Sequence, residues 1–300
     1  MTPLAAVDAQ TVVDAIGLGA VYALMAVGIG LVFGVLRLVN FAYGQLIMAG
    51  AYTLAVTTDW PVAASIGTCF VVVVALSLAM ERLVFRPLRG QSPAVMLVTT
   101  FAVAFLLQSI ALLKFGALGK PVSSVASLNQ AIEVGGVEVR KITLVAIAVA
   151  IVALALLALL LNRTSVGLHT RAAAADFATA RFLGVRANRV IGFSVLLSGV
   201  LAAAVAVILT VQNPFVTPDF ALRDTIIVLV GVVVGGIDRL GTATLGGFAI
   251  GFTTGFLGAA LPAAQSQYLP SAVFGLVILV LLLRPAGLFA RRGAGAVERV

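Results

Sequence analysis

The sequence predicts an all-α polytopic membrane protein with 8–9 transmembrane helices. Hydrophobic residues make up 62% of the 300 residues and charged residues only 10%, whereas a soluble domain is roughly 45–50% apolar. Long uncharged runs separate the charges, and a membrane-crossing helix needs about 20 mostly apolar residues. The runs do not alternate between polar and apolar residues, as a transmembrane β-barrel requires. Helices are therefore the expected spanning elements.

The predicted helices follow the uncharged runs along the chain. Six runs are long enough for one crossing each: Ala15–Leu36, Leu38–Thr58, Trp60–Met80, Gly90–Leu113, Ile142–Asn162 and Val190–Pro218. A seventh run, Leu240–Leu283, is long enough for two crossings, and Pro262 and Pro270 favour a break within it. The stretch Phe220–Ile237 is shorter. It predicts either a shallow ninth span or a half-helix buried among its neighbours.

Basic residues are distributed unequally between the two sides of the predicted membrane. With nine spans, alternate loops place fourteen of them on one side and five on the other. The richer side holds Arg37, Arg82, Arg86, Arg89, Arg163, Arg171, Arg181, Arg186, Arg189, Arg239, Arg284, Arg291, Arg292 and Arg299, and the poorer side holds Lys114, Lys120, Arg140, Lys141 and Arg223. The positive-inside rule places the richer side in the cytoplasm. The N-terminus is then outside and the C-terminus cytoplasmic. The same rule explains the net charge of +8 without a nucleic-acid partner.

The whole chain, residues 1–300, is expected to form a single transmembrane domain with one long loop on each side. The external loop, residues 114–141, contains "EVGGVEV", which predicts a small β-hairpin around Gly135 and Gly136. This loop would serve as a lid, as a docking surface or as a plain connector. The cytoplasmic loop covers residues 163–189.

The cytoplasmic loop contains "RAAAADFATARFLGVRANR", from Arg171 to Arg189. Its alanines favour a helix, and a glycine often ends one. We expect a short amphipathic helix that stops at Gly184. Phe177, Ala180, Leu183 and Gly184 share one face by their spacing, with Asp176 and Arg181 off that face. Such a helix would lie on the inner leaflet or fit a groove on a cytoplasmic partner.

Polar residues inside the predicted spans form two groups. Asn40, Tyr43, Gly44 and Gln45 follow the first span, and Thr99, Thr100 and Gln108 lie on the fourth. Burying polar groups in a bilayer is costly unless they are paired or functional. The two groups would either line a translocation path or form hydrogen bonds between helices. The threonines have a further alternative, because their hydroxyls can bond to carbonyls of their own helix.

Glycines recur at a spacing of four in three places, at Gly30 and Gly34, at Gly231 and Gly235, and at Gly247, Gly251 and Gly255. Small residues at this spacing let two transmembrane helices approach closely. We therefore expect these positions to lie in tight helix–helix contacts.

Neither ATP binding nor catalysis is indicated by the residues. The chain has no G-x-x-x-x-G-K-[ST] phosphate loop, so ATP would act only through a partner. It has one histidine, His169, and one cysteine, Cys69, which the sequence places in a loop and a span. No metal or other cofactor is expected. Asp224 is expected near a span end, so the predicted core has no deep carboxylate, which disfavours an ion-driven transporter and a cation channel.

Four stretches resemble the permease family of ABC importers for branched-chain and other hydrophobic amino acids. They are "YALMAVGIGLVFGVLRLVNFAYGQLIMAGAY" (Tyr22–Tyr52), "RAAAADFATARFLGVRANRVI" (Arg171–Ile191), "GGIDRLGTATLGG" (Gly235–Gly247) and "LLRPAGLF" (Leu282–Phe289). The resemblance covers nearly the whole chain and keeps the order of the parts. It implies ATP-driven import by alternating access in a multi-pass protein of the cell membrane.

The resemblance also implies partners and site residues. The partners would be two cytoplasmic ATPase subunits, a second permease subunit, homologous or identical, and an external substrate-binding protein. The cytoplasmic loop would be the coupling helix that seats in an ATPase, through Arg171, Asp176, Phe177, Ala180, Leu183 and Gly184. The two polar groups would lie near the translocation path. The alternative function is a stand-alone secondary transporter or channel for a small solute such as urea or an amide, with Asp224 as its proton site.

Overall fold

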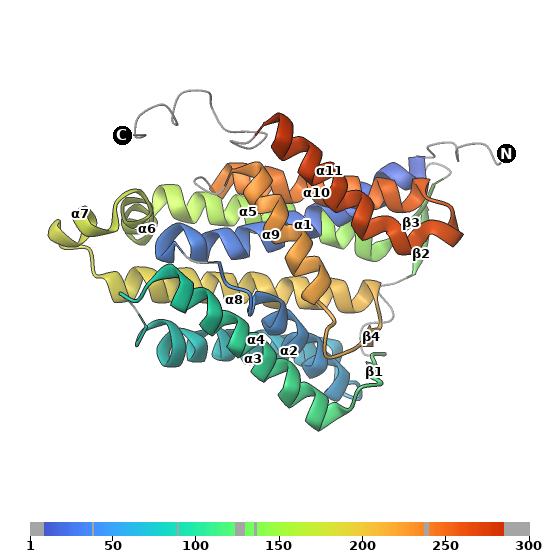
Figure 1. Cartoon of the computed structure of the whole chain (residues 1–300). Helices are drawn as coiled ribbons and strands as arrows, with labels where there is room; N and C mark the ends of the chain where they lie inside the picture. The colour runs from blue at the N-terminus through green and yellow to red at the C-terminus, as the bar shows by residue number, and fades with distance from the viewer. Residues whose placement is uncertain are drawn as a thin grey trace.

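The computed structural model describes residues 9–37, 39–88, 90–123, 130–134, 137–236 and 240–284. Within these ranges the chain forms a bundle whose longest helices run side by side (Figure 1). Seven helical segments are long and apolar enough to cross a membrane. They are α1 (Ala9–Leu36), α3 (Val62–Met80) with its continuation Glu81–Phe85, α4 (Pro93–Phe115), α5 (Lys141–Arg163), α8 (Ala187–Gln212), α10 (Leu240–Ala260), and α11 (Leu269–Leu283) with the turn before it.

Two further helices, α2 (Tyr43–Val56) and α9 (Leu222–Gly235), have only 14 residues each. At 1.5 Å per residue each is about 21 Å long, shorter than the roughly 30 Å hydrocarbon core. The prediction of a full span over Leu38–Thr58 is therefore wrong. The chain leaves α1 at Arg37, whose φ is 53°, and helix resumes only at Tyr43. For the ninth segment, the half-helix alternative is the one that the structure shows.

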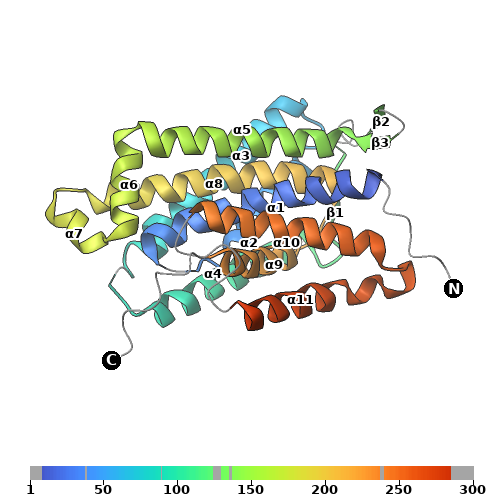
Figure 2. The same ribbon diagram turned by 90° about the horizontal axis from the view of Figure 1, so that it is seen from above.

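Helices α1 and α8 form the centre of the bundle, and α1 packs against α10 along a glycine seam (Figure 2). An added Cβ at Gly247 would come within 2.4 Å of the Ala26 Cβ, and one at Gly251 within 2.8 Å of the Gly19 Cα. A third, at Gly255, would come within 2.8 Å of the Ala15 Cα. Only glycine allows this approach, so the close packing predicted for these three positions is confirmed.

The other two glycine pairs differ from each other. Gly231 and Gly235 of α9 face Gly246 of α10 at backbone distance, as predicted for tight contacts. Gly30 faces the Leu240 side chain, while an added Cβ at Gly34 would lie 4.0 Å from the Ala174 Cβ, an ordinary contact. The spacing of four therefore marks the glycines of the tight α1–α10 and α9–α10 contacts, but it also marks Gly34, whose contact is an ordinary one.

The two ends of the bundle carry different structures (Figure 1). At one end, β2 (Ala131–Val134) pairs antiparallel with β3 (Val137–Arg140), which confirms the predicted hairpin. At the same end β1 (Lys120–Pro121) pairs with β4 (Phe215–Val216), a connection that the sequence did not indicate. The opposite end carries two short helices, α6 (Ser165–Ala175) and α7 (Phe177–Phe182).

Candidate functional site: the α6–α7 segment and the helix starts inside the bundle

The predicted cytoplasmic helix is two helices, because the chain breaks at Asp176. The backbone of Asp176 is extended, with φ −147° and ψ 107°. Its carboxylate accepts a hydrogen bond from the Thr179 N–H at 3.2 Å and a second, short one from the Thr179 hydroxyl. Aspartate is a favoured N-cap because its side chain satisfies free N–H groups at a helix start. The prediction of one continuous helix is wrong for this reason.

The predicted end of α7 at Gly184 is confirmed, but the apolar face predicted for this helix is not. Gly184 has φ 89°, and the Val185 N–H donates to the Ala180 carbonyl at 3.0 Å, which is the predicted glycine stop. Ala180 is 3% exposed and packs into the core, whereas Leu183 is 80% exposed. The single ridge predicted through both residues is therefore wrong, because Leu183 and Gly184 lie in the turn after α7.

The most exposed large apolar side chains at this end are those of Phe182 and Leu183, which we call the α7 tip. Phe182 is 91% exposed and was missed by the spacing argument, which followed Phe177 instead. An aromatic residue beside Leu183 in an otherwise basic loop was the available signal. The backbone of Phe177 begins α7, and its side chain lies outside the described part of the structure. Arg171 and Asp176 are exposed.

The α6–α7 segment is attached to the central helix α1. The Arg37 guanidinium, just after α1, donates a hydrogen bond to the Ala174 carbonyl at 2.7 Å. That carbonyl belongs to the last turn of α6, where a cation is favoured by the helix dipole. A Cβ added at Gly34 of α1 would lie 4.0 Å from the Ala174 Cβ, so α1 and α6 also come close there. The α6–α7 segment is therefore linked directly to the end of the helix that runs through the core.

Inside the bundle, α4 contacts the segment that leads into α2, next to the first predicted polar group. The Thr100 hydroxyl lies 3.3 Å from the Val39 carbonyl and 2.9 Å from the Leu97 carbonyl. Phe41 and Phe101 stack with ring centroids 4.0 Å apart. The segment before α2 is thus anchored to α4, and both groups contribute to helix packing.

The remaining residues of these groups have local partners or are partly buried. The Asn40 side-chain oxygen accepts from the Ala42 N–H at 3.1 Å and so holds the turn that starts α2. The Thr99 hydroxyl bonds to the Val95 carbonyl of its own helix at 2.7 Å, as one alternative predicted. Gln108 lies two turns further along α4 and is half-buried.

Tyr43, Gly44 and Gln45 are buried in the core. The Tyr43 ring packs so closely on Gly28 that an added Cβ at Gly28 would overlap it. Among the described residues, the Tyr43 hydroxyl and the Gln45 side-chain oxygen have no hydrogen-bond partner. An added Cβ at Gly44 would lie 2.5 Å from the Thr225 hydroxyl and 3.0 Å from the Ala221 carbonyl. Gly44 therefore permits the start of α2 to touch the start of α9.

The start of α9 also carries two charges. The Tyr22 hydroxyl of α1 donates to one Asp224 carboxylate oxygen at 2.7 Å. Asp224 is half-buried, and Arg223 beside it is exposed. The sequence suggested a position for Asp224 near a span end. It is instead hydrogen-bonded to a residue at the middle of the 28-residue α1, because the chain turns inward after β4 before α9 begins.

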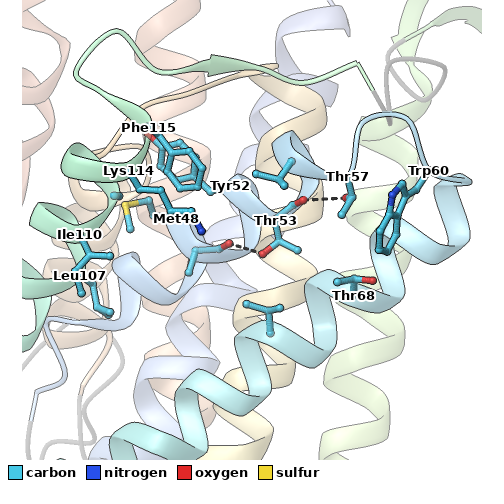
Figure 3. A pocket seen from close by; sticks show the side chains of 14 residues that line it. Met48, Tyr52, Thr53, Thr57, Trp60, Thr68, Leu107, Ile110, Lys114 and Phe115 are labelled. Carbon is cyan, nitrogen blue, oxygen red and sulfur yellow. Dashed lines mark hydrogen bonds between the residues drawn. The ribbon is translucent and has the colours of Figure 1, made fainter.

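A separate pocket of about 520 Å³ lies between α2, α3 and α4 (Figure 3). Tyr52 and Phe115 stack at its side with centroids 4.3 Å apart, and the Lys114 ammonium lies 5.5 Å from the Phe115 centroid. The hydroxyls of Thr53 and Thr57 bond to carbonyls of their own helix, so its wall is mainly apolar. No residue predicted to line the path belongs to this pocket.

Comparison with known proteins identifies the family. A family model described as "Branched-chain amino acid transport system / permease component" matches residues 11–282. The chain belongs to this family. It is therefore a permease subunit, a multi-pass transport protein of the cell membrane, as the resemblance implied.

Relatives match the chain over almost its whole length. The high-affinity branched-chain amino acid transport system permease protein BraD of Pseudomonas aeruginosa is 29% identical over 296 residues, which cover 94% of this chain and 95% of BraD. LivH of Escherichia coli K12, with the same description, is 28% identical over 94% of this chain and 95% of its own length. A probable LivH of Methanocaldococcus jannaschii is 27% identical over 92% and 88%. No solved structure gave a significant match.

Proposed function

We propose that this permease imports branched-chain or other hydrophobic amino acids by alternating access, driven by ATP hydrolysis in partner subunits. The observation that carries the proposal is the α6–α7 segment. It stands at one end of the bundle, presents an apolar tip and is hydrogen-bonded to α1 through Arg37 (Figure 1). An exposed pair of large apolar residues at the end of a short helix fits a groove on a protein partner.

The proposed partners follow from what this chain lacks and from its relatives. Its sequence has no phosphate loop, so two cytoplasmic ATPase subunits would supply the energy. BraD and LivH are described as permease proteins of transport systems, which supports a multi-subunit assembly here. We propose a second permease subunit, homologous or identical, and an external binding protein. The binding protein would dock at the end of the bundle that carries the β2–β3 hairpin, which we call the hairpin end.

We also propose that the N-terminus faces outward and the C-terminus faces the cytoplasm. Arg37, Arg163 and Arg171 lie at the end of the bundle that carries α6 and α7, whereas Lys120 and Arg140 lie at the hairpin end. This distribution fits the positive-inside rule. In this orientation the α7 tip would reach an ATPase, with Phe177 alongside it.

Within the segment, the residues would divide between contact and support. Arg171, Phe182 and Leu183 are exposed and would touch the ATPase. Asp176 caps α7, Gly184 ends it, and Ala180 packs it against the bundle. These three residues would fix the direction in which the tip points.

We place the translocation path at the starts of α2 and α9. Asn40 and Thr100 would hold α2 and α4 in position behind it, and Gly44 would let α9 approach. Tyr43, Gln45, Thr99 and Gln108 would lie next to the path rather than at its surface in this conformation.

The test is a mild-detergent pull-down of the tagged chain from its native membrane, read by mass spectrometry. We expect an ATPase with a phosphate loop in the wild-type sample. Phe182→Asp or Leu183→Asp should reduce its recovery at least tenfold, because either puts a charge into an apolar contact. Leu118→Asp is the matched control, because Leu118 is also highly exposed but lies near β1, at the other end. Recovery of the wild-type chain without an ATPase would contradict the proposal.

A further inference from the structure

The start of α9 lies deep in the membrane by two independent measures. Asp224 is hydrogen-bonded to Tyr22, which is 13 residues from the start of α1, or about 20 Å along the helix. Gly44, which touches Ala221 and Thr225, is 12 residues from the end of α2, or about 18 Å. Half of a hydrocarbon core is about 15 Å. Both measures therefore put Arg223 and Asp224 near mid-membrane.

Within the described ranges, one stripe of α9 is exposed. Arg223, Ile226 and Val233 are exposed and Val230 is partly exposed, at spacings of three and four that define one face. Asp224 borders this stripe. The opposite side of α9, including Thr225 and Val228, is buried against its neighbours.

This face of α9 is unsuited to lipid. An arginine or an aspartate near mid-membrane is costly to bury and almost always faces a bundle interior or a water-filled cavity. The exposed stripe in the middle of α5, which includes Ile151 and Leu156, by contrast carries no charge. The charges therefore distinguish the α9 stripe from the surfaces that contact lipid.

We propose that the α9 stripe lines the translocation path and binds the zwitterionic backbone of the amino-acid substrate. The inference rests on the proposed function and specifies its substrate site. The Arg223 guanidinium would bind the substrate carboxylate, and the Asp224 carboxylate would bind its ammonium group. Ile226 would contact the apolar side chain.

The contacts of Asp224 suit this role. Tyr22 holds one carboxylate oxygen, and the second has no hydrogen-bond donor among the described residues. An amino acid carries one positive and one negative group close together, and Arg223 and Asp224 present the complementary charges side by side. Tyr22 would act as a positioning residue that fixes the direction of the carboxylate.

The first experiment measures whether the exposed stripe of α9 is accessible to water. A membrane-impermeant, charged thiol reagent is applied to right-side-out vesicles that carry Ile226→Cys and to inside-out vesicles that carry Val233→Cys, because Val233 lies ten residues, or about 15 Å, beyond Arg223 toward the cytoplasmic end of α9. The unchanged chain gives the background, because its lone Cys69 is buried. Leu156→Cys is the lipid-facing control. We expect labelling at positions 226 and 233, slowed by leucine, and none at position 156. Absence of labelling, or labelling that leucine does not slow, would overturn the inference.

The second experiment measures leucine uptake by right-side-out vesicles that contain ATP. Asp224→Asn should raise the KM for leucine at least tenfold with the protein present at a normal level, and Tyr22→Phe should raise it several-fold. Asp219→Asn, an exposed carboxylate five residues earlier, should change nothing. Wild-type vesicles without leucine uptake would refute the proposed function and this ligand together. Normal uptake by wild type and by Asp224→Asn alike would refute only the inference.

Discussion

Helices α2 and α9 have the same length, begin inside the bundle and meet where Gly44 contacts Thr225, yet their surroundings differ. Most of α2 is buried, and its first polar side chains, Tyr43 and Gln45, are enclosed in the core. The start of α9 instead carries two charges at the edge of an exposed stripe. The difference separates two short helices of equal length: α2 supports the packing of the core, whereas α9 leaves two charges accessible, which is why we propose a ligand-binding role for α9 alone.

The contact between the two helices provides the largest expected effect. Gly44→Val would place methyl groups against the Ala221 carbonyl and Thr225, where even one added carbon is 3.0 Å or less from both. Overpacking of this kind costs about 1–3 kcal/mol or more. We expect much less folded protein, measured by size-exclusion chromatography in detergent. Gly67→Val on α3, where an added Cβ meets nothing within 4 Å, is the control and should remain monodisperse. Equal behaviour of the two variants would contradict the described contact.

Removing the buried polar atoms of α2 should have the smallest effect. The Tyr43 hydroxyl and the Gln45 oxygen have no partner among the described residues, and an unsatisfied buried polar group costs about 1–3 kcal/mol. Tyr43→Phe should therefore leave thermal stability unchanged or raise it, and leave the KM for leucine within twofold. A thermal unfolding curve and an uptake assay check the two parts. A tenfold rise in KM would show that Tyr43 touches the substrate, and α2 would then share the role that we give to α9.

Much of this architecture was predictable because it depends on local sequence patterns. Uncharged runs predicted most of the long helices, the spacing of Gly247, Gly251 and Gly255 predicted the α1–α10 seam, and "EVGGVEV" predicted the hairpin. Each of these patterns acts over a few residues or one helix. The resemblance to a permease family, carried by four stretches, was confirmed by the match over residues 11–282.

The errors arose where tertiary contacts decide the structure. The uncharged run Leu38–Thr58 is long enough to span, but Asn40 and Thr100 stabilise a non-helical start that shortens it. Asp176 was read as a polar position on a helix, although its side chain caps a new one. Asp224 was placed near a span end because loop assignment cannot show that the chain after β4 turns inward. The roles of both sets of site residues remain predictions.

The most direct test of an ATP-driven permease is leucine uptake into proteoliposomes that contain the complete complex, with ATP inside and the binding protein outside. We predict uptake that requires hydrolysable ATP. In liposomes made with the Phe182→Asp chain it should fall at least tenfold. Leucine uptake by the chain alone, at the same rate with and without ATP, would contradict the account and identify a stand-alone transporter.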